Sequence, residues 1–359
     1  MSHPERLDER VPPTVSRYLA ERAADLRKGR VDRVRLLPLL LDDPLNDLLR
    51  RRRGFFQQCS VSEKSFGLAV DFSRHVRPSV AYPQGRTVSG SFDVLVVTQR
   101  VCILASSLPS DPHRHGPALL ADCAYPLAKR PFLTSPELCR LITRAADSHD
   151  WEPIAVDTMG YDRKTLKFRR DLKRQPVADA YREMSAQGRQ VHKVKVCFRD
   201  EVPKETLLAS FDRHAETTIQ RGALQTAVTD FLFPAIDTVS AAGADYAVSR
   251  AERWAEQEVL QLSFSEGMFQ DRDDMSDLCQ ALRKRDGLSV TTMHLNPYLQ
   301  AQVLDFFTGA AVELLVTDER TVSLIPRSGD CRSTLEKIAE TVFYYFGEAA
   351  VTRELLLPA

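Results

Sequence analysis

Two short segments of this chain alternate apolar with basic side chains, and this pattern most constrains the fold. The segments are KTLKFRRDLK, residues 164–173, and VHKVKVCFR, residues 191–199. Alternation with a period of two is typical of a strand that buries one face and exposes the other. Arg170, at an apolar position of the first segment, is an exception to the alternation. The basic side chains at the alternate positions are Lys167, Arg169, Lys173, Lys193, Lys195 and Arg199.

The residues between these two segments predict a short helix. Pro176 opens it, Gly188 ends it, and Val177, Ala180 and Met184 fall on one helical face. If the two strands share a sheet through a crossover helix, that helix must cover their apolar face. We therefore predict a basic βαβ unit whose six basic side chains are exposed together.

The net charge of zero results from two unequal halves. Residues 1–200 carry 35 basic and 24 acidic side chains, whereas residues 201–359 carry 14 and 25. Basic side chains neutralise phosphates, so a positive half favours nucleic acid or another polyanion as partner. The predicted basic face carries no aromatic side chain for base stacking, which indicates binding that is largely independent of sequence.

The pattern of strands and helices predicts a multi-domain α+β protein with a basic N-terminal half and an acidic C-terminal domain. Alternating and apolar runs predict hairpins at 93–105 and 312–325, and helices at 14–28, 274–285, 297–308 and 333–346. We divide the chain into a basic helical segment (1–60), a β-rich region with a proline-broken loop at 108–136 and a helix (61–150), the basic βαβ unit (151–200) and an acidic α+β domain (201–359).

The proline-broken loop contains the densest polar motif, SDPHRHGP at residues 110–117. On an extended segment, His113 and His115 would lie on the same side and could hold a metal ion such as zinc together with a carboxylate. Two solvated loop histidines are the alternative interpretation. The motif therefore gives a secondary hypothesis, a metal-dependent hydrolase or nuclease.

Several enzyme classes lack their sequence motifs. The chain has neither the P-loop pattern GxxxxGK[ST] nor the dinucleotide pattern GxGxxG, and neither GxSxG nor HExxH. Acidic residues at 271–277 lack the glycine and the final glutamate of a calcium loop and are better explained as the start of a helix. A loose nuclease-like group, Glu152, Asp157, Asp162 and Lys164, precedes the first basic strand.

The distribution of apolar residues and cysteines predicts a cytoplasmic protein that does not enter a membrane. No run of about 18 apolar residues is free of charge, and the N-terminus has no apolar signal segment. The seven cysteines are scattered and form no C-x-x-C motif. No cofactor is predicted.

These observations favour a non-enzymatic accessory or regulatory protein that binds nucleic acid or another polyanion through the basic sheet face. The main alternative is an assembly protein whose basic half pairs with an acidic protein surface, within one chain or between chains of a homo-oligomer. The metal-dependent hydrolase or nuclease is the third hypothesis.

Overall fold

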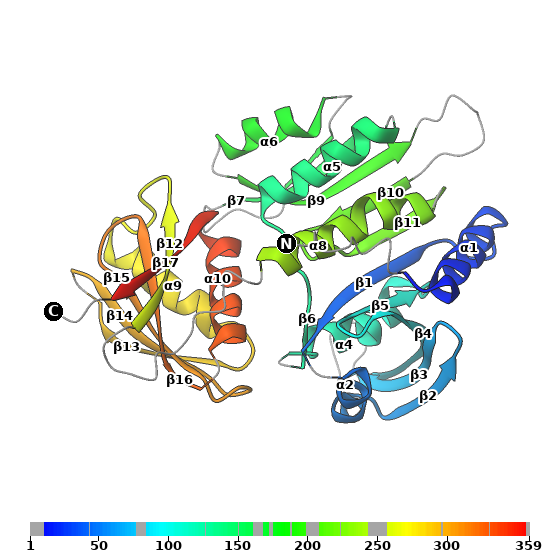
Figure 1. The fold of residues 1–359 in the computed structure, drawn as a ribbon, viewed down its shortest axis with the longest axis horizontal. Helices are drawn as coiled ribbons and strands as arrows, with labels where there is room; N and C mark the ends of the chain where they lie inside the picture. Colours follow the sequence, from blue (N-terminus) through cyan, green and yellow to red (C-terminus); the bar gives the residue numbers. More distant parts are fainter. Residues whose placement is uncertain are drawn as a thin grey trace, which may run out of the picture. The chain divides into compact units, whose positions relative to one another are not determined.

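The structure is a computed structural model that describes thirteen stretches of the chain. They are residues 11–42, 44–76, 84–125, 127–149, 151–160, 168–171, 175–186, 189–198, 208–222, 224–242, 257–295, 297–329 and 331–356. The chain divides into two compact units, Met1–Val239 and Ser240–Ala359. Each unit contains an antiparallel sheet and helices, which confirms the predicted α+β class (Figure 1).

The first unit is built on an eleven-stranded antiparallel sheet. Across the sheet the strands are β2 (Gln58–Lys64), β3 (Gly67–Val76), β4 (Arg86–Thr98), β5 (Val101–Ser106), β1 (Val34–Leu41), β11 (Thr217–Arg221), β10 (Leu208–Asp212), β9 (Arg189–Phe198), β7 (Trp151–Gly160) and β8 (Phe168–Asp171), with β6 (Ala128–Lys129) paired to β1. The predicted hairpin at 93–105 is confirmed, since β4 and β5 pair antiparallel from Asp93 opposite Ala105.

Strand β1 is buried along its whole length because both faces of the sheet are covered there. Leu36 and Leu40 join one apolar core, which includes residues of α1 (Pro13–Arg27), α5 (Ser135–His149), α6 (Val177–Ser185), α7 (Leu224–Ala227) and α8 (Phe233–Ala242). Leu37 and Leu39 join a second core with α2 (Leu45–Arg52) and α4 (Pro117–Asp122). A strand buried on both faces explains the continuous leucine run in its sequence.

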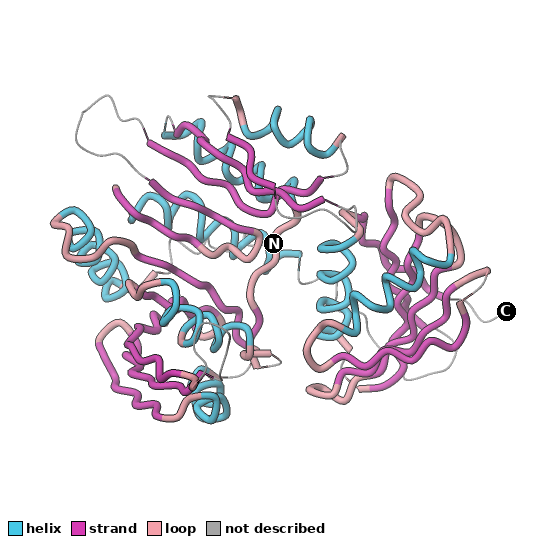
Figure 2. The backbone as a smooth tube through the Cα atoms, turned by 180° about the vertical axis from the view of Figure 1, so that it is seen from behind, coloured by secondary structure: helices cyan, strands magenta, loops and turns pink. Residues whose placement is uncertain are grey.

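The predicted crossover β8–α6–β9 is present, with β7 inserted between its two strands. Both β8 and β9 pair antiparallel with β7, so they run parallel to each other. Helix α6 contacts β9 and packs beside α5. Figure 1 shows α5 and α6 in front of these strands, and Figure 2, from behind, shows the strands in front of the helices.

The segment predicted as a proline-broken loop, 108–136, is largely regular. It forms α3 (Ser110–His115), α4 and β6. Pro109 precedes the first residue of α3, and Pro117 occupies the first position of α4. Proline is well tolerated there because the first helical amides have no partner within the helix. Pro109 and Pro117 therefore stand at the starts of helices instead of breaking structure.

The described part of the second unit contains a six-stranded antiparallel sheet with helices α9 (Arg272–Arg283) and α10 (Arg332–Tyr345). The strand order is β13 (Leu288–His294), β14 (Leu299–Asp305), β15 (Ala311–Val316), β16 (Thr321–Ser328), β12 (Gln257–Phe264) and β17 (Ala349–Leu356). Helices α9 and α10 pack against each other. Asp271 caps α9 by accepting amide hydrogen bonds, and the β15–β16 hairpin confirms the prediction at 312–325.

One predicted helix of this unit is a strand. Residues 299–305 form β14, with Leu299, Ala301 and Val303 buried and the intervening side chains more exposed. The helix-start signal Asn296-Pro297 led to the helix prediction, but the burial period of two is that of a strand. The predicted helix at 333–346 is α10, which begins one residue earlier, and its N-cap, Cys331, makes no side-chain capping bond.

The boundary between the compact units lies later in the chain than the predicted step at residue 200. The segments 1–60, 61–150 and 151–200 all supply elements to the first unit, and strands β10 and β11 complete its sheet. The long helical region 224–242 then follows, with a π-helical turn at Val228–Leu232 directly before α8. Pro234 lies just after this turn, where helices commonly bend.

No helix in the described part of the chain is long and apolar enough to cross a membrane.

Candidate functional site

Strand β9 presents two lysines on one face and valines on the other. Val194 and Val196 are fully buried in the core shared with α5 and α6. Lys193 and Lys195 alternate with them and are half-buried on the opposite face. The alternation predicted for this strand is therefore present in the structure.

The other predicted basic residues are only partly covered by the structure. Lys167, Lys173 and Arg199 lie outside the described residues. Arg169 belongs to β8, and the register places it opposite Asp157 of β7. Asp157 is opposite Lys193, which in turn is opposite Asp212 of β10. In the register, this row of positions across four strands alternates basic and acidic residues, so the positions opposite the predicted basic residues include aspartates.

His113 and His115 do not face a common point. Both lie in helix α3, whereas the metal hypothesis required an extended segment. Helical residues two apart differ by about 200° in direction, so their side chains diverge. His113 Nε2 lies 3.6 Å from Glu216 Oε1, and His115 Nε2 lies 3.7 Å from Asp111 Oδ1. Within the described ranges, no group of three or more His, Cys, Asp or Glu side chains could hold a metal ion.

Two of the predicted residues, His113 and Lys193, instead meet in one group of ionisable side chains. We call this group the Glu216 cluster, and its members are His113, Arg130, Lys193, Asp212 and Glu216. Arg130 bridges two carboxylates, with Nη2 3.4 Å from Glu216 Oε2 and Nη1 2.9 Å from Asp122 Oδ1. Lys193 acts electrostatically on both Asp212 and Glu216.

The hairpin turn between β10 and β11 positions the two carboxylates of the cluster. Asp212 Oδ1 accepts hydrogen bonds from the amides of His214 (2.9 Å) and Glu216 (3.0 Å). Ala215 has a φ of 54°, which lies in the left-handed region that non-glycine residues seldom adopt. The side chain of Asp212 and the backbone of Ala215 together make the tight turn that carries Glu216 back toward Asp212.

A buried arginine fixes this turn to the segment that precedes α5. Arg213 is 1% exposed, its Nε donates to the carbonyl of Leu133 at 2.8 Å, and its guanidinium lies 4.5 Å from the ring centre of Phe132. The amide of Leu133 donates to the carbonyl of Arg213 at 2.6 Å. These contacts bring Arg130, three residues before Leu133, beside Glu216.

The two carboxylates of the cluster have pKa values shifted in opposite directions. Burial and the charge of Glu216 raise the pKa of Asp212 to about 6, although Arg130 and Lys193 act against this. Burial alone would raise the pKa of Glu216, but His113, Arg130 and Lys193 together lower it. Asp212 is therefore the carboxylate that takes up a proton first as the pH falls through about 6, while Glu216 stays ionised to lower pH.

His113 is the unusual member of the cluster. Its side chain is 8% exposed, and neither ring nitrogen has a hydrogen-bond partner among the described residues. The distance of 3.6 Å to Glu216 is longer than a hydrogen bond. Protonation of Asp212 would remove a negative charge that acts on Lys193 and Arg130.

Sequence reasoning missed Arg130, Asp212 and Glu216. Arg130 and Glu216 are 86 residues apart, and no local pattern links them. Asp212 and Glu216 stand at the two ends of the sequence DRHAE, residues 212–216. Such a short polar segment indicates a hairpin turn but does not indicate a functional site.

Comparison with known proteins adds no assignment. No protein-family model matches the chain, and no curated protein shows significant sequence similarity to it.

Proposed function

We propose that the first unit binds nucleic acid or another polyanion, without catalysis, through the face of β9 that carries Lys193 and Lys195. The observation that supports this most directly is the position of these lysines, both on the face opposite the core formed with α5 and α6. Lys195 makes no ion pair with any residue that the structure describes. No described residue therefore competes with a phosphate for its charge.

The Glu216 cluster limits how strongly this face binds an anion. Asp212 and Glu216 compete with a phosphate for Lys193 and Arg130, because all four lie in one electrostatic group. Polyanion binding should therefore be weak at neutral pH and should fall steeply with salt. An acidic protein surface could bind the same lysines and is the alternative partner. The experiment below distinguishes it from nucleic acid.

The proposal is tested by fluorescence anisotropy with labelled single- and double-stranded DNA between about 50 and 200 mM salt. Lys195→Glu should reduce the affinity for DNA by roughly tenfold. It should also reduce the slope of log affinity against log salt concentration by about one, because one phosphate contact is lost. Lys193→Gln removes the second cation without adding a third carboxylate beside Asp212 and Glu216. The matched control is Arg272→Glu with Lys284→Glu. Both residues are exposed in the second unit, Arg272 as the first residue of helix α9 and Lys284 as its C-cap.

Binding that the lysine variants and the control reduce equally would contradict the proposal, and so would binding that ignores salt. No binding of either DNA at the lowest salt concentration would also contradict it for nucleic acid. Binding to an acidic polypeptide such as polyglutamate, lost in Lys195→Glu while DNA does not bind, would assign the face to a protein partner instead.

A further inference from the structure

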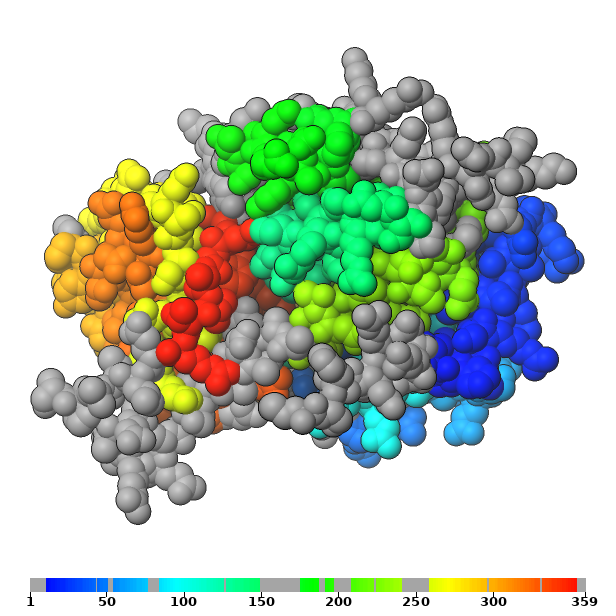
Figure 3. Space-filling view, turned by 45° about the horizontal axis from the view of Figure 1, so that its top comes forward, coloured from blue at the N-terminus to red at the C-terminus, as the bar shows by residue number. Residues whose placement is uncertain are grey.

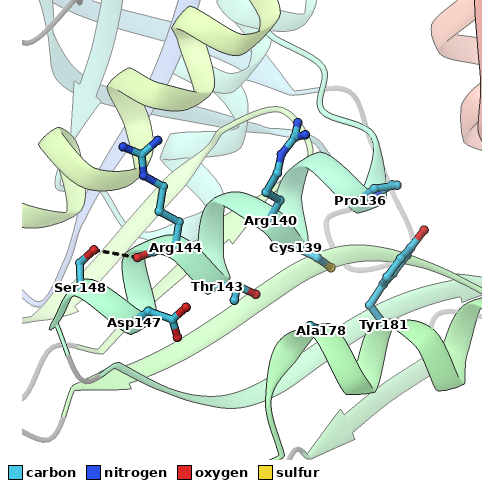
Figure 4. A pocket seen from close by; sticks show the side chains of 9 residues that line it. All are labelled: Pro136, Cys139, Arg140, Thr143, Arg144, Asp147, Ser148, Ala178 and Tyr181. Carbon is cyan, nitrogen blue, oxygen red and sulfur yellow. Dashed lines mark hydrogen bonds between the residues drawn. The ribbon is translucent and has the colours of Figure 1, made fainter.

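A groove lies along helix α5 on the side of the sheet opposite Lys193 and Lys195. Helices α5 and α6 pack side by side, as the adjoining blue-green and green surfaces in Figure 3 show. The groove has a volume of about 530 Å³ and is drawn in Figure 4. Cavities of small-molecule sites are of roughly this size, about 300–1,000 Å³.

Two arginines line this groove, and neither pairs with a carboxylate in the described part of the chain. Arg140 and Arg144 are four residues apart, so they leave the same side of α5 one turn apart (Figure 4). Both are exposed, and neither guanidinium makes an ion pair or hydrogen bond with a residue that the structure describes. Asp147, which also lines the groove, does not pair with them. Like charges at this spacing repel each other, so an anion held between them would relieve that repulsion.

The rest of the groove is mainly apolar. Cys139 is buried, and Ala178 and Tyr181 of α6 are half-buried along the opposite wall. Thr143 of α5 adds a hydroxyl that is buried and has no hydrogen-bond partner among the described residues. A buried hydroxyl without a partner is energetically costly, and a ligand group in the groove would supply the missing partner.

We propose that the α5–α6 groove binds a small amphipathic organic anion. Its phosphate or carboxylate head would lie between Arg140 and Arg144, and its apolar part would cover Ala178 and Tyr181. Paired arginines suit such heads because the planar guanidinium donates two parallel hydrogen bonds to two oxygens. This site is separate from Lys193 and Lys195, so it does not depend on the proposed polyanion binding.

Isothermal titration calorimetry with octyl phosphate and octanoate, both below their micelle concentrations, tests the proposal. Inorganic phosphate provides the head group alone, and octyl glucoside provides the same chain without charge. We expect at least one octyl anion to bind one site per chain, at least about tenfold more tightly than inorganic phosphate or octyl glucoside. Absence of binding by both octyl anions, or equal binding of the neutral detergent, would overturn the proposal.

Variants then assign the binding to this groove. Arg140→Gln with Arg144→Gln should weaken the octyl anion by at least about tenfold. The matched control is Arg182→Gln, which removes an exposed arginine of α6 that pairs with Asp179 outside the groove. Equal weakening by the control, or unchanged binding in the double variant, would overturn the assignment.

Thr143→Val gives an independent readout of the same site. It preserves the shape of the side chain while removing the unpartnered hydroxyl, so the free protein should melt at a higher temperature. The same variant should bind the octyl anion less tightly, because the ligand loses a hydrogen bond. A rise in melting temperature with unchanged affinity would show that Thr143 does not contact the ligand and would overturn this placement of the head group.

Discussion

Lys193 lies directly opposite Asp212 where strand β9 pairs with strand β10. Residues directly opposite in an antiparallel pair share one face of the sheet, so the lysine and the aspartate are close neighbours. Burial and the charge of Glu216 raise the pKa of Asp212 to about 6, and the charge of Lys193 opposes this rise. The protonation of Asp212 and Glu216 therefore changes the charge around Lys193, which we propose contacts a polyanion.

Replacing Asp212 by asparagine should strengthen polyanion binding. The change removes one negative charge beside Lys193, while the amide oxygen of the new side chain can still accept the two turn amides. We expect a gain in DNA affinity of about two- to fivefold at about pH 7.5 and low salt, measured by fluorescence anisotropy. Asp179→Asn, on helix α6 across the sheet, is the control and should leave affinity unchanged. A weaker or unchanged affinity in Asp212→Asn would contradict the role of Asp212.

The pH dependence of binding should follow the same carboxylate. As the pH falls through about 6, Asp212 takes up a proton, and the charge that competes for Lys193 is lost. DNA affinity should therefore rise between about pH 7.5 and about pH 5.5. The rise should be smaller in Asp212→Asn, because that variant carries no charge at this position at any pH. An identical pH profile in the two proteins would exclude Asp212 as the titrating group.

The same shift predicts how Asp212 affects stability. Its pKa is raised from 3.8 to about 6, so between these values the folded protein binds more protons than the unfolded chain. Stability from this group therefore falls as the pH rises through that window. Asp212→Asn should gain stability relative to the natural protein as the pH rises from about 4 to about 7, on the order of 1–3 kcal/mol in urea unfolding. A difference that is constant with pH would contradict the shift.

Glu216 should behave in the opposite way. Burial opposes the shift, but His113, Arg130 and Lys193 lower its pKa in the folded protein. Its contribution to stability is therefore present above its unfolded pKa and is lost as the pH falls below it. Glu216→Gln should lower the free energy of unfolding at neutral pH by about 1 kcal/mol or more. The loss should shrink as the pH falls below 4.5, the ordinary value for this group. Equal loss at neutral pH and at about pH 4 would show a role in packing and not in charge.

The sequence predicted those elements whose signals are local. The alternation around Val194 and Lys193 identified β9. The spacing of Val177, Ala180 and Met184 identified α6, and all three of these side chains are buried. Strand β14 was mistaken for a helix because Asn296-Pro297 resembles a helix start and the run contains few β-branched residues. Its burial pattern depends on pairing with β13 and β15, which the sequence does not show.

The Glu216 cluster lay beyond sequence reasoning for the same physical reason. Its members come from α3, the segment after β6, β9 and both sides of the β10–β11 turn, and only the folded sheet brings them together. His113 was predicted as a metal ligand because the segment was expected to be extended, and helix α3 turns it away from His115. The residue was singled out from its motif, but its neighbours and therefore its chemistry are different from those predicted.

The last prediction concerns the attachment of helix α1 to the sheet. Tyr18 Oη donates to Asp93 Oδ2 at 2.6 Å, and Arg22 binds both, with Nε 3.0 Å from Tyr18 Oη and Nη2 3.1 Å from Asp93 Oδ2. Tyr18→Phe with Asp93→Asn should show a coupling of about 1–2 kcal/mol in a double-mutant cycle of urea unfolding, because a partly buried hydrogen bond to a carboxylate is stronger than a neutral one. The exposed pair Asp179 and Arg182 is the reference, expected to couple by less than about 0.5 kcal/mol. Equal coupling in the two pairs would mean that the hydrogen bonds of Tyr18 contribute no more to stability than a surface ion pair does. In that case apolar contacts hold α1 on the sheet, such as the contact between the rings of Tyr18 and Phe66, whose centroids are 4.7 Å apart.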